Sequence, residues 1–410
     1  MSRFDALPVS PFTRLNKLLE GVAPGAPPIH MHIGEPQHAV PAFVGEILAK
    51  HTADFGRYPP IIGPEPLRKA IAAWLTRRYA LSAGVDADRH ILPLVGTREG
   101  LFSAAFVTVP EDKHGKKPAV LIPNPFYQCY AAAALSAGAD PIYVNATRET
   151  NFLPDFAALP RETLARTAAV FMCSPSNPEG GAANESEWRR IFELADEFDF
   201  TVLADECYTE IYADKPPTGA LGVRQKMTGD FSRLLSFHSL SKRSNLPGLR
   251  SGFVAGDANL IARFREFRNV AGPQLPLPIA AVSTAAWSDE THVEENRALY
   301  KQKFELAKNR LGNRFGFRGV CQRTNSGLLN KRRQVERIDF IDAHRCPLKI
   351  RDPRRRFIRN DGRLFGRRYL FNFRFCPGLS HGRSRKDRRR NVVISVGNAD
   401  QVKILELLIG

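Results

Sequence analysis

The sequence predicts an α/β fold built on a mainly parallel sheet with helices on both faces. Short apolar segments alternate with amphipathic helical segments along most of the chain, which is typical of such sheets. Two apolar segments also end abruptly in polar residues: residues 168–173 precede Ser174, and residues 201–204 precede Asp205. Because the carboxyl ends of parallel strands share one edge of a sheet, we expect a ligand site at that edge.

The individual elements follow from three local patterns. Continuous apolar runs bounded by turn residues predict buried strands, whereas apolar residues repeated every three or four positions predict helices. Asn184 and Glu187 match a capping box, which predicts that a helix begins there. The predicted strands span residues 91–95, 119–122, 141–144, 168–173, 201–204, 234–239 and 252–255. The predicted helices span residues 12–19, 67–79, 99–107, an alanine-rich stretch ending at 137, and residues 184–198, 258–269, 276–287 and 289–311.

Lys242 lies directly after a predicted buried strand, in a segment that carries small hydroxyl residues. We expect a loop there, which would remove the lysine from bulk water. Desolvation disfavours the ammonium form, so such a lysine can act as a nucleophilic amine toward an aldehyde. Ser239, Ser241 and Arg250 supply hydroxyl groups and a planar guanidinium, which are suited to binding phosphate. Taken alone, Ser-x-Ser-Lys also fits a surface lysine in a polar turn.

Polar side chains after the two neighbouring strands favour the catalytic interpretation. Asn177, Asp205 and Tyr208 are expected to meet Lys242 at the same edge of the sheet. Their chemistry fits pyridoxal phosphate: Asp205 would keep the pyridine nitrogen protonated, and Asn177 and Tyr208 would donate hydrogen bonds to the ring's phenolic oxygen. The sequence therefore predicts pyridoxal 5'-phosphate as the cofactor.

Three motifs occur together, in an order and at separations that are typical of one enzyme family. They are Asn-Pro-x-Gly at 177–180, Asp-x-x-Tyr at 205–208, and a serine and lysine segment followed by Gly-x-Arg-x-Gly at 239–252. Up to about residue 318, the chain thus resembles the fold-type I pyridoxal-phosphate aminotransferases of class I/II. Ile-Pro-Asn-Pro-Phe-Tyr-Gln-Cys-Tyr at 122–130 and the full 239–252 segment resemble the bacterial N-succinyldiaminopimelate aminotransferases of lysine biosynthesis.

The resemblance implies further site residues. Gly34 matches the position where the backbone approaches the substrate carboxylate, Tyr58 matches a tyrosine that reaches the cofactor phosphate of a second subunit, and Tyr127 matches the aromatic ring that stacks on the pyridine. Thr97 and Arg98 match the phosphate loop, where a glycine turn opens a helix with free N–H groups. A turn glycine, a structural tyrosine and a core aromatic are the plain alternatives. The predicted cofactor site comprises Tyr58, Gly96, Thr97, Arg98, Tyr127, Asn177, Asp205, Tyr208, Ser239, Ser241, Lys242 and Arg250, with Gly34 and Asn177 at the substrate.

Composition narrows the class of protein. The 410 residues are 43% hydrophobic, which suffices for a large core. We expect a cytoplasmic enzyme, because the first thirty residues contain no apolar stretch suited to a signal peptide and no segment suits a membrane span. The six cysteines are dispersed without zinc-ligand spacing, so no metal site is predicted.

The net charge of +17 is concentrated in one part of the chain. Residues 1–318 contain 36 Lys and Arg against 34 Asp and Glu, whereas residues 319–410 contain 23 against 8. The enzyme-like part is therefore nearly neutral, and no specific nucleic-acid partner is predicted. The expected organisation is an N-terminal arm at 1–30, a large cofactor-binding domain at 31–290, a linking helix at 291–318 and an arginine-rich region at 319–410.

The arginine-rich region departs from the family pattern where a small domain is expected. Arg374 is the nearest candidate for the arginine that pairs with the substrate carboxylate, although chance explains it better among so many arginines. A shifted reading frame, a basic nucleic-acid-binding appendage and a divergent small domain are three possible origins, of which we favour the first. If no small domain forms, we expect the apolar face of the helix at 289–311 (Val293, Leu299, Phe304, Leu311) to be exposed.

The predicted function is transamination of N-succinyl-LL-2,6-diaminopimelate with 2-oxoglutarate by a homodimer. Aspartate- or alanine-type aminotransferases and β-lyases use the same cofactor residues, so they remain alternatives. A pseudoenzyme with a basic tail, or the product of a damaged gene, is the alternative outside the enzymes.

Overall fold

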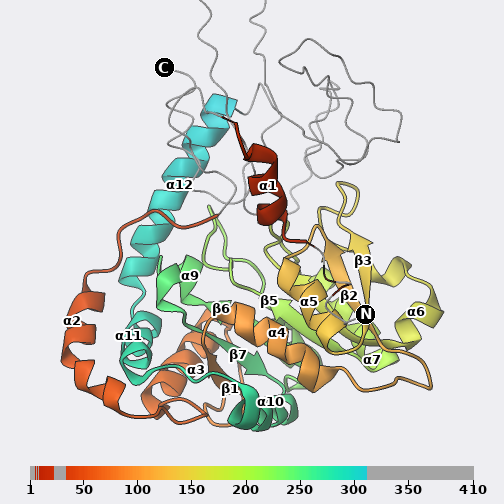
Figure 1. Cartoon of the computed structure of the whole chain (residues 1–410), viewed down its shortest axis with the longest axis horizontal. Helices are drawn as coiled ribbons and strands as arrows, with labels where there is room; N and C mark the ends of the chain where they lie inside the picture. Colours follow the sequence, from red (N-terminus) through yellow and green to blue (C-terminus); the bar gives the residue numbers. More distant parts are fainter. Residues whose placement is uncertain (1–4, 6, 8, 23–33, 312–410) are drawn as a thin grey trace, which may run out of the picture.

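The computed structural model describes residues 5, 7, 9–22 and 34–311 of the chain. A seven-stranded sheet forms its centre, with the strand order β1-β7-β6-β5-β4-β2-β3 (Figure 1). Strands β2 to β6 run parallel to their neighbours within this group, whereas β7 is antiparallel to both β6 and β1. The predicted mainly parallel sheet is therefore confirmed. Its strands are β1 (Ile91–Leu94), β2 (Ala119–Asn124), β3 (Asp140–Asn145), β4 (Thr167–Cys173), β5 (Thr201–Asp205), β6 (Leu234–Ser239) and β7 (Gly252–Gly256).

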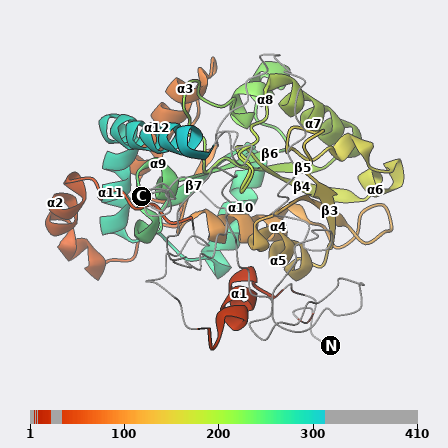
Figure 2. The same ribbon diagram turned by 90° about the horizontal axis from the view of Figure 1, so that it is seen from above.

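Helices cover both faces of the sheet. Figure 2 shows α3, α7 and α8 on one side and α4 and α5 on the other. One apolar core lies on the side of α2, α3, α7, α8 and α11, and a second lies on the side of α4, α5 and α10. The helices of these two layers are α2 (Phe43–Lys50), α3 (Glu65–Tyr79), α4 (Thr97–Thr108), α5 (Gln128–Ser136), α7 (Glu185–Phe198), α8 (Ala220–Thr228), α10 (Ala258–Ala271) and α11 (Leu277–Ser288).

Strands β4, β5 and β6 are buried along their whole length. This agrees with the mainly apolar sequences of β4 and β5, since a strand covered on both faces has no polar side to present. In β6 the buried residues also include Ser236 and His238, whose Oγ and Nε2 lie 2.9 Å apart. Within the sheet Cys173 lies opposite Asp205, and Asp205 lies opposite Phe237. The polar residues that follow these three strands therefore emerge side by side at one edge.

The remaining elements are short or lie outside the two layers. They are α1 (Pro11–Leu19), α6 (Arg161–Ala165), α9 (Leu240–Arg243), α12 (Thr291–Leu311) and the 3₁₀ helices η2 (Thr52–Gly56), η3 (Phe156–Ala158) and η4 (Pro247–Leu249). The capping box is confirmed, because Asn184 accepts from the Glu187 N–H at 3.0 Å while Glu187 accepts from the Asn184 N–H at 2.7 Å.

Lys242 does not lie in a loop, as the sequence had indicated, but in the short helix α9. The Ser239 side chain accepts a hydrogen bond from the Ser241 N–H at 3.1 Å, and such a cap favours a helical turn directly after the strand. The hydroxyl residues around Lys242 therefore shape the backbone as well as presenting polar groups. Helices α2 and α8 were also not predicted from the sequence.

Helix α12 is partly covered by the body of the protein. Val293 and Phe304 are 1% and 6% exposed, whereas Leu299 is 42% exposed. Phe304 belongs to a small apolar cluster with Ile211, and Tyr208 packs against that cluster. Val293 and Phe304 are therefore buried, whereas the expected exposure of this face depended on residues 319–410 forming no small domain, and those residues lie outside the described ones.

Other expectations lie outside what the structure describes. Residues 319–410, Arg374 and the side chain of Leu311 are in this group, and the proposed domain boundaries stay predictions. Among the residues at 5, 7, 9–22 and 34–311, the structure contains no helix that is both long and apolar enough to cross a membrane.

Candidate active site

The buried carboxylate of Asp205 lies at the end of β5, in the middle of the polar edge. Asp205 is 5% exposed, and its Oδ2 accepts a hydrogen bond from the Tyr130 hydroxyl at 2.5 Å. Burial raises the pKa of Asp205, while the hydrogen bonds from Tyr130 and Cys207 act in the opposite direction. Within the described part of the chain Asp205 forms no ion pair. A buried carboxylate held only by neutral donors fits a cationic ring N–H, which is the group that protonated pyridine presents.

Lys242 projects from α9 near the segment that contains Gly34. Its Nζ donates a hydrogen bond to the Gly34 carbonyl, 208 positions away in sequence. The lysine predicted to be catalytic and the glycine predicted to lie at the substrate are thus in direct contact. Ser239 and Ser241 lie beside them, with their Oγ atoms 2.9 Å apart.

A glycine turn at the start of α4 accommodates an arginine. Gly96 has a φ of +80°, and the Arg250 guanidinium lies so close to it that a Cβ at position 96 would collide with Nη2. Thr97, the first residue of α4, approaches Cys207 with Oγ1 3.2 Å from Sγ. The turn thereby brings a helix N-terminus, a hydroxyl and a guanidinium together, and this combination fits a phosphate dianion.

Two further pairs complete the edge. The Asn177 Nδ2 donates to the Tyr208 hydroxyl at 3.1 Å, as expected for side chains that share one target. The Arg98 Nε donates to the Tyr127 hydroxyl, and the guanidinium carbon lies 5.6 Å from the Tyr127 ring centroid. In this structure Arg98 therefore contacts the predicted stacking ring.

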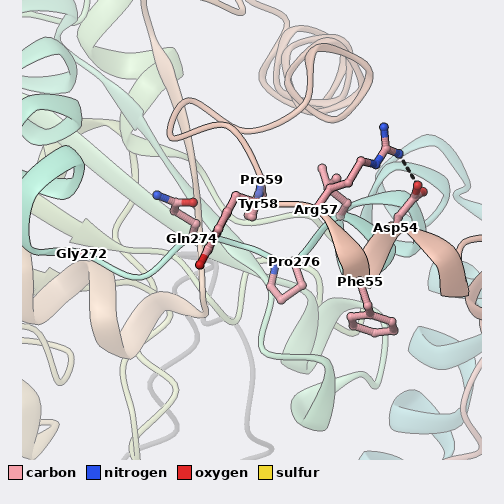
Figure 3. Close-up of a pocket in the computed structure, with 9 residues that line it drawn as sticks. Asp54, Phe55, Arg57, Tyr58, Pro59, Gly272, Gln274 and Pro276 are labelled. Atoms are coloured by element: carbon pink, nitrogen blue, oxygen red, sulfur yellow. Dashed lines mark hydrogen bonds and ion pairs between the residues drawn. The ribbon is translucent and has the colours of Figure 1, made fainter.

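Tyr58 is separate from the other predicted residues in the single chain. It is 97% exposed and lines an open surface pocket of about 440 Å³ together with Arg57 and Gln274 (Figure 3). None of the other predicted site residues lines this pocket. An exposed tyrosine beside a hollow is compatible with a contact to a second subunit.

Tyr130 is a site residue that the sequence analysis missed. It is 1% exposed, and its ring stacks on Phe171 with centroids 4.4 Å apart and planes at 11°. A buried tyrosine usually finds a partner for its hydroxyl, but the sequence does not show which one. Its place three residues after Tyr127, at the start of a helix beside the expected stacking ring, is the signal that was available.

Comparisons with known proteins agree with this geometry. Residues 26–329 match the family model described as aminotransferase class I and II. The LL-diaminopimelate aminotransferase of Dehalococcoides mccartyi is 32% identical over 308 residues, which are 73% of this chain and 76% of that protein. The 4-dedimethylamino-4-oxo-anhydrotetracycline transaminase OxyQ of Streptomyces rimosus is 34% identical over 285 residues, which are 69% and 73% of the two chains.

A solved structure has the same fold. The crystal structure of an aminotransferase from Neisseria meningitidis superposes with a TM-score of 0.74 at 40% identity, covering 78% of this chain and 81% of that one. The motifs, the sheet and the polar residues at its edge are therefore all explained by membership of one family. The chain belongs to the class I and II aminotransferases, a family of pyridoxal-phosphate-dependent enzymes.

Proposed function

We propose that this aminotransferase transfers the amino group of N-succinyl-LL-2,6-diaminopimelate to 2-oxoglutarate, as a cytoplasmic homodimer. The observation that carries the assignment of the site is the polar edge, where three adjacent parallel strands end: Asp205 is the last residue of β5, and Asn177 and Lys242 follow β4 and β6. The choice of substrate is supported by the sequence motifs at residues 122–130 and 239–252, which resemble those of the bacterial N-succinyldiaminopimelate aminotransferases.

Lys242 is the proposed catalytic residue. When bound, the cofactor supplies an aldehyde and a ring that withdraws electrons from the substrate Cα. Lys242 would hold the cofactor at that aldehyde through its Nζ. The same Nζ would act as the general base that carries the proton of the substrate Cα. The contact between Nζ and the Gly34 carbonyl supports this role, because it places the amine beside the proposed substrate segment.

Asp205, Asn177 and Tyr208 are proposed to hold the ring. The raised pKa of Asp205 reflects a buried charge without a cationic partner in the described residues, and a protonated ring nitrogen would be that partner. Asn177 and Tyr208 already lie within hydrogen-bonding distance of each other, so both could donate to the phenolic oxygen. Tyr127 would stack on the ring and keep its plane fixed.

The phosphate is proposed to bind at the turn before α4. The helix N-terminus at Gly96, the Thr97 hydroxyl and the Arg250 guanidinium converge there. Ser239 and Ser241 add hydroxyl groups from the start of α9. Tyr58 would add a donor from a second subunit, which is consistent with its exposure in the single chain.

LL-diaminopimelate without the succinyl group is the second candidate substrate. Several relatives at about 30% identity carry the name LL-diaminopimelate aminotransferase, whereas OxyQ at 34% acts on an unrelated compound by its name. Identity at this level therefore leaves the substrate open, because selectivity comes from a few pocket contacts.

The site is tested by trapping. Borohydride reduction of the cofactor-loaded protein should attach the cofactor to the peptide that contains Lys242. Lys242→Ala should abolish transamination and still bind the cofactor, because its phosphate and ring contacts come from other residues. Lys116→Ala is the matched control, since Lys116 is a surface lysine in an ion pair with Glu162. Attachment at another lysine would refute the assignment.

The substrate is tested by comparing kcat/KM. Single-turnover and steady-state assays should be run with N-succinyl-LL-2,6-diaminopimelate, LL-diaminopimelate, aspartate and alanine, with 2-oxoglutarate as acceptor. We expect the succinylated compound to give the highest kcat/KM. A preference for LL-diaminopimelate would favour the second candidate, and a preference for aspartate or alanine would reject both.

A further inference from the structure

One face of α12 contacts the segments that form the proposed active site. His292, Asn296, Tyr300 and Phe304 are four residues apart, so they lie on the same side of the helix. The His292 Nε2 lies 2.8 Å from the Ser244 Oγ, and the Tyr300 ring lies 4.8 Å from the His38 ring. Figures 1 and 2 both show α12 close to α9. The helix thus faces the backbone that carries Lys242.

Asn296 contacts the end of α9 directly. Its Nδ2 donates hydrogen bonds to the carbonyls of Lys242 and Arg243, each at 3.1 Å, and the residue is 7% exposed. The last carbonyls of a helix have no partner within it, and α9 has only four residues. Asn296 therefore supplies donors that α9 cannot supply to itself.

The other end of the same amide contacts the N-terminal segment. The Asn296 Oδ1 lies 2.6 Å from the His38 Nδ1. Because a carbonyl only accepts, the Nδ2 must face the two α9 carbonyls, and the Oδ1 must accept a hydrogen bond from the Nδ1–H of His38. Asn245, two residues after the end of α9, donates hydrogen bonds to the carbonyls of His38 and Ala39.

These contacts hold Lys242 from two sides. Its backbone carbonyl is bound by Asn296, which also binds His38, and its Nζ is bound by Gly34 of the same N-terminal segment. A shift of α12 would therefore move the base of the lysine relative to the segment that its amine contacts. Active-site placement matters at this scale, because a displacement of about 1 Å can reduce the rate by about 100-fold.

We propose that Asn296 is a positioning residue, which aligns Lys242 with the Gly34 segment. The inference rests on the proposed catalytic role of Lys242. Two substitutions separate the contacts. Asn296→Asp preserves size and an oxygen toward His38 but loses the donor to both carbonyls, and Asn296→Ala loses both contacts. Asn259→Ala is the matched control, because Asn259 lies exposed in the first turn of α10.

The measurements are made on the full-length protein loaded with pyridoxal phosphate. We expect both Asn296 variants to bind the cofactor with nearly unchanged Kd and to show nearly unchanged KM for the amino substrate. Their kcat should fall by about 10- to 100-fold. The pH midpoint of the visible absorbance, which reports the bond between Lys242 and the cofactor, should differ from that of the unmodified protein and of Asn259→Ala.

The outcomes distinguish a wrong catalytic lysine from a wrong role for Asn296. Borohydride trapping at a residue other than Lys242 would overturn the proposed function and this inference with it. Trapping at Lys242, with kcat and the absorbance midpoint unchanged in both variants, would overturn only the role of Asn296. Failure of both variants to fold would also overturn it, because Asn296 would then serve stability alone.

Discussion

Tyr130→Phe tests how the protein holds Asp205 in its charged form. The substitution removes only the hydroxyl, and the ring can keep its stacking on Phe171, where the centroids are 4.4 Å apart. The lost interaction is the 2.5 Å hydrogen bond to Oδ2. Because phenylalanine keeps the ring that fills this buried position, we expect little change in the fold around it.

The magnitude follows from the charge state of Asp205 before and after the cofactor binds. A hydrogen bond to a charged group contributes about 1.5–3 kcal/mol, and one between neutral groups contributes about 0.5–1.5 kcal/mol. Burial raises the pKa of Asp205 in the empty site, whereas the bound cation requires the carboxylate. The hydroxyl thus favours the bound state by roughly 1–1.5 kcal/mol, which corresponds to about tenfold weaker binding in Tyr130→Phe.

The assay is a titration of apoprotein with pyridoxal phosphate, followed by absorbance, at several pH values. The deficit should be largest at low pH, where binding must deprotonate Asp205. It should shrink as pH rises, because the carboxylate is then already ionised in the empty site. Tyr143→Phe is the control, since Tyr143 on β3 is 43% exposed. Equal affinity of Tyr130→Phe and the unmodified protein at every pH would refute the reasoning.

Two further predictions concern the residues around this site. Burial raises the pKa of Glu206, which is 1% exposed, from 4.5 to about 7. The protonated carboxyl therefore adds to the free energy of unfolding in full below pH 4.5, and this contribution is lost as pH rises through about 7. Glu206→Gln should therefore stabilise the apoprotein by about 3 kcal/mol above that pH and by little near pH 4.5, as measured by urea unfolding, and a pH-independent difference would contradict this. Gly96→Ala should cost about 1–3 kcal/mol, because Gly96 has φ +80° and ψ +153°, a conformation that essentially only glycine adopts. The substitution should also weaken cofactor binding by displacing Arg250, and unchanged affinity in the same titration would contradict the proposed phosphate site.

The sequence by itself determined the sheet and the residues at its edge. Strands β4 and β5 are almost continuous apolar runs, β6 begins with Leu234 and Leu235, and each strand ends in polar residues or is followed by them at once. This pattern is local, so it can be read without knowing which segments become neighbours. Asp205, Asn177 and Lys242 were predicted for this reason, and in the structure they lie at or after the ends of three adjacent strands.

Only the tertiary structure decided which distant groups meet. The contacts between Tyr130 and Asp205, and between Asn296 and Lys242, join residues 75 and 54 positions apart. Such hydrogen bonds leave no periodic signal in the sequence, because each depends on how a helix packs against the sheet or against α9. Tyr58 is exposed in the single chain. The sequence suggested a contact between Tyr58 and a second subunit only through the family resemblance.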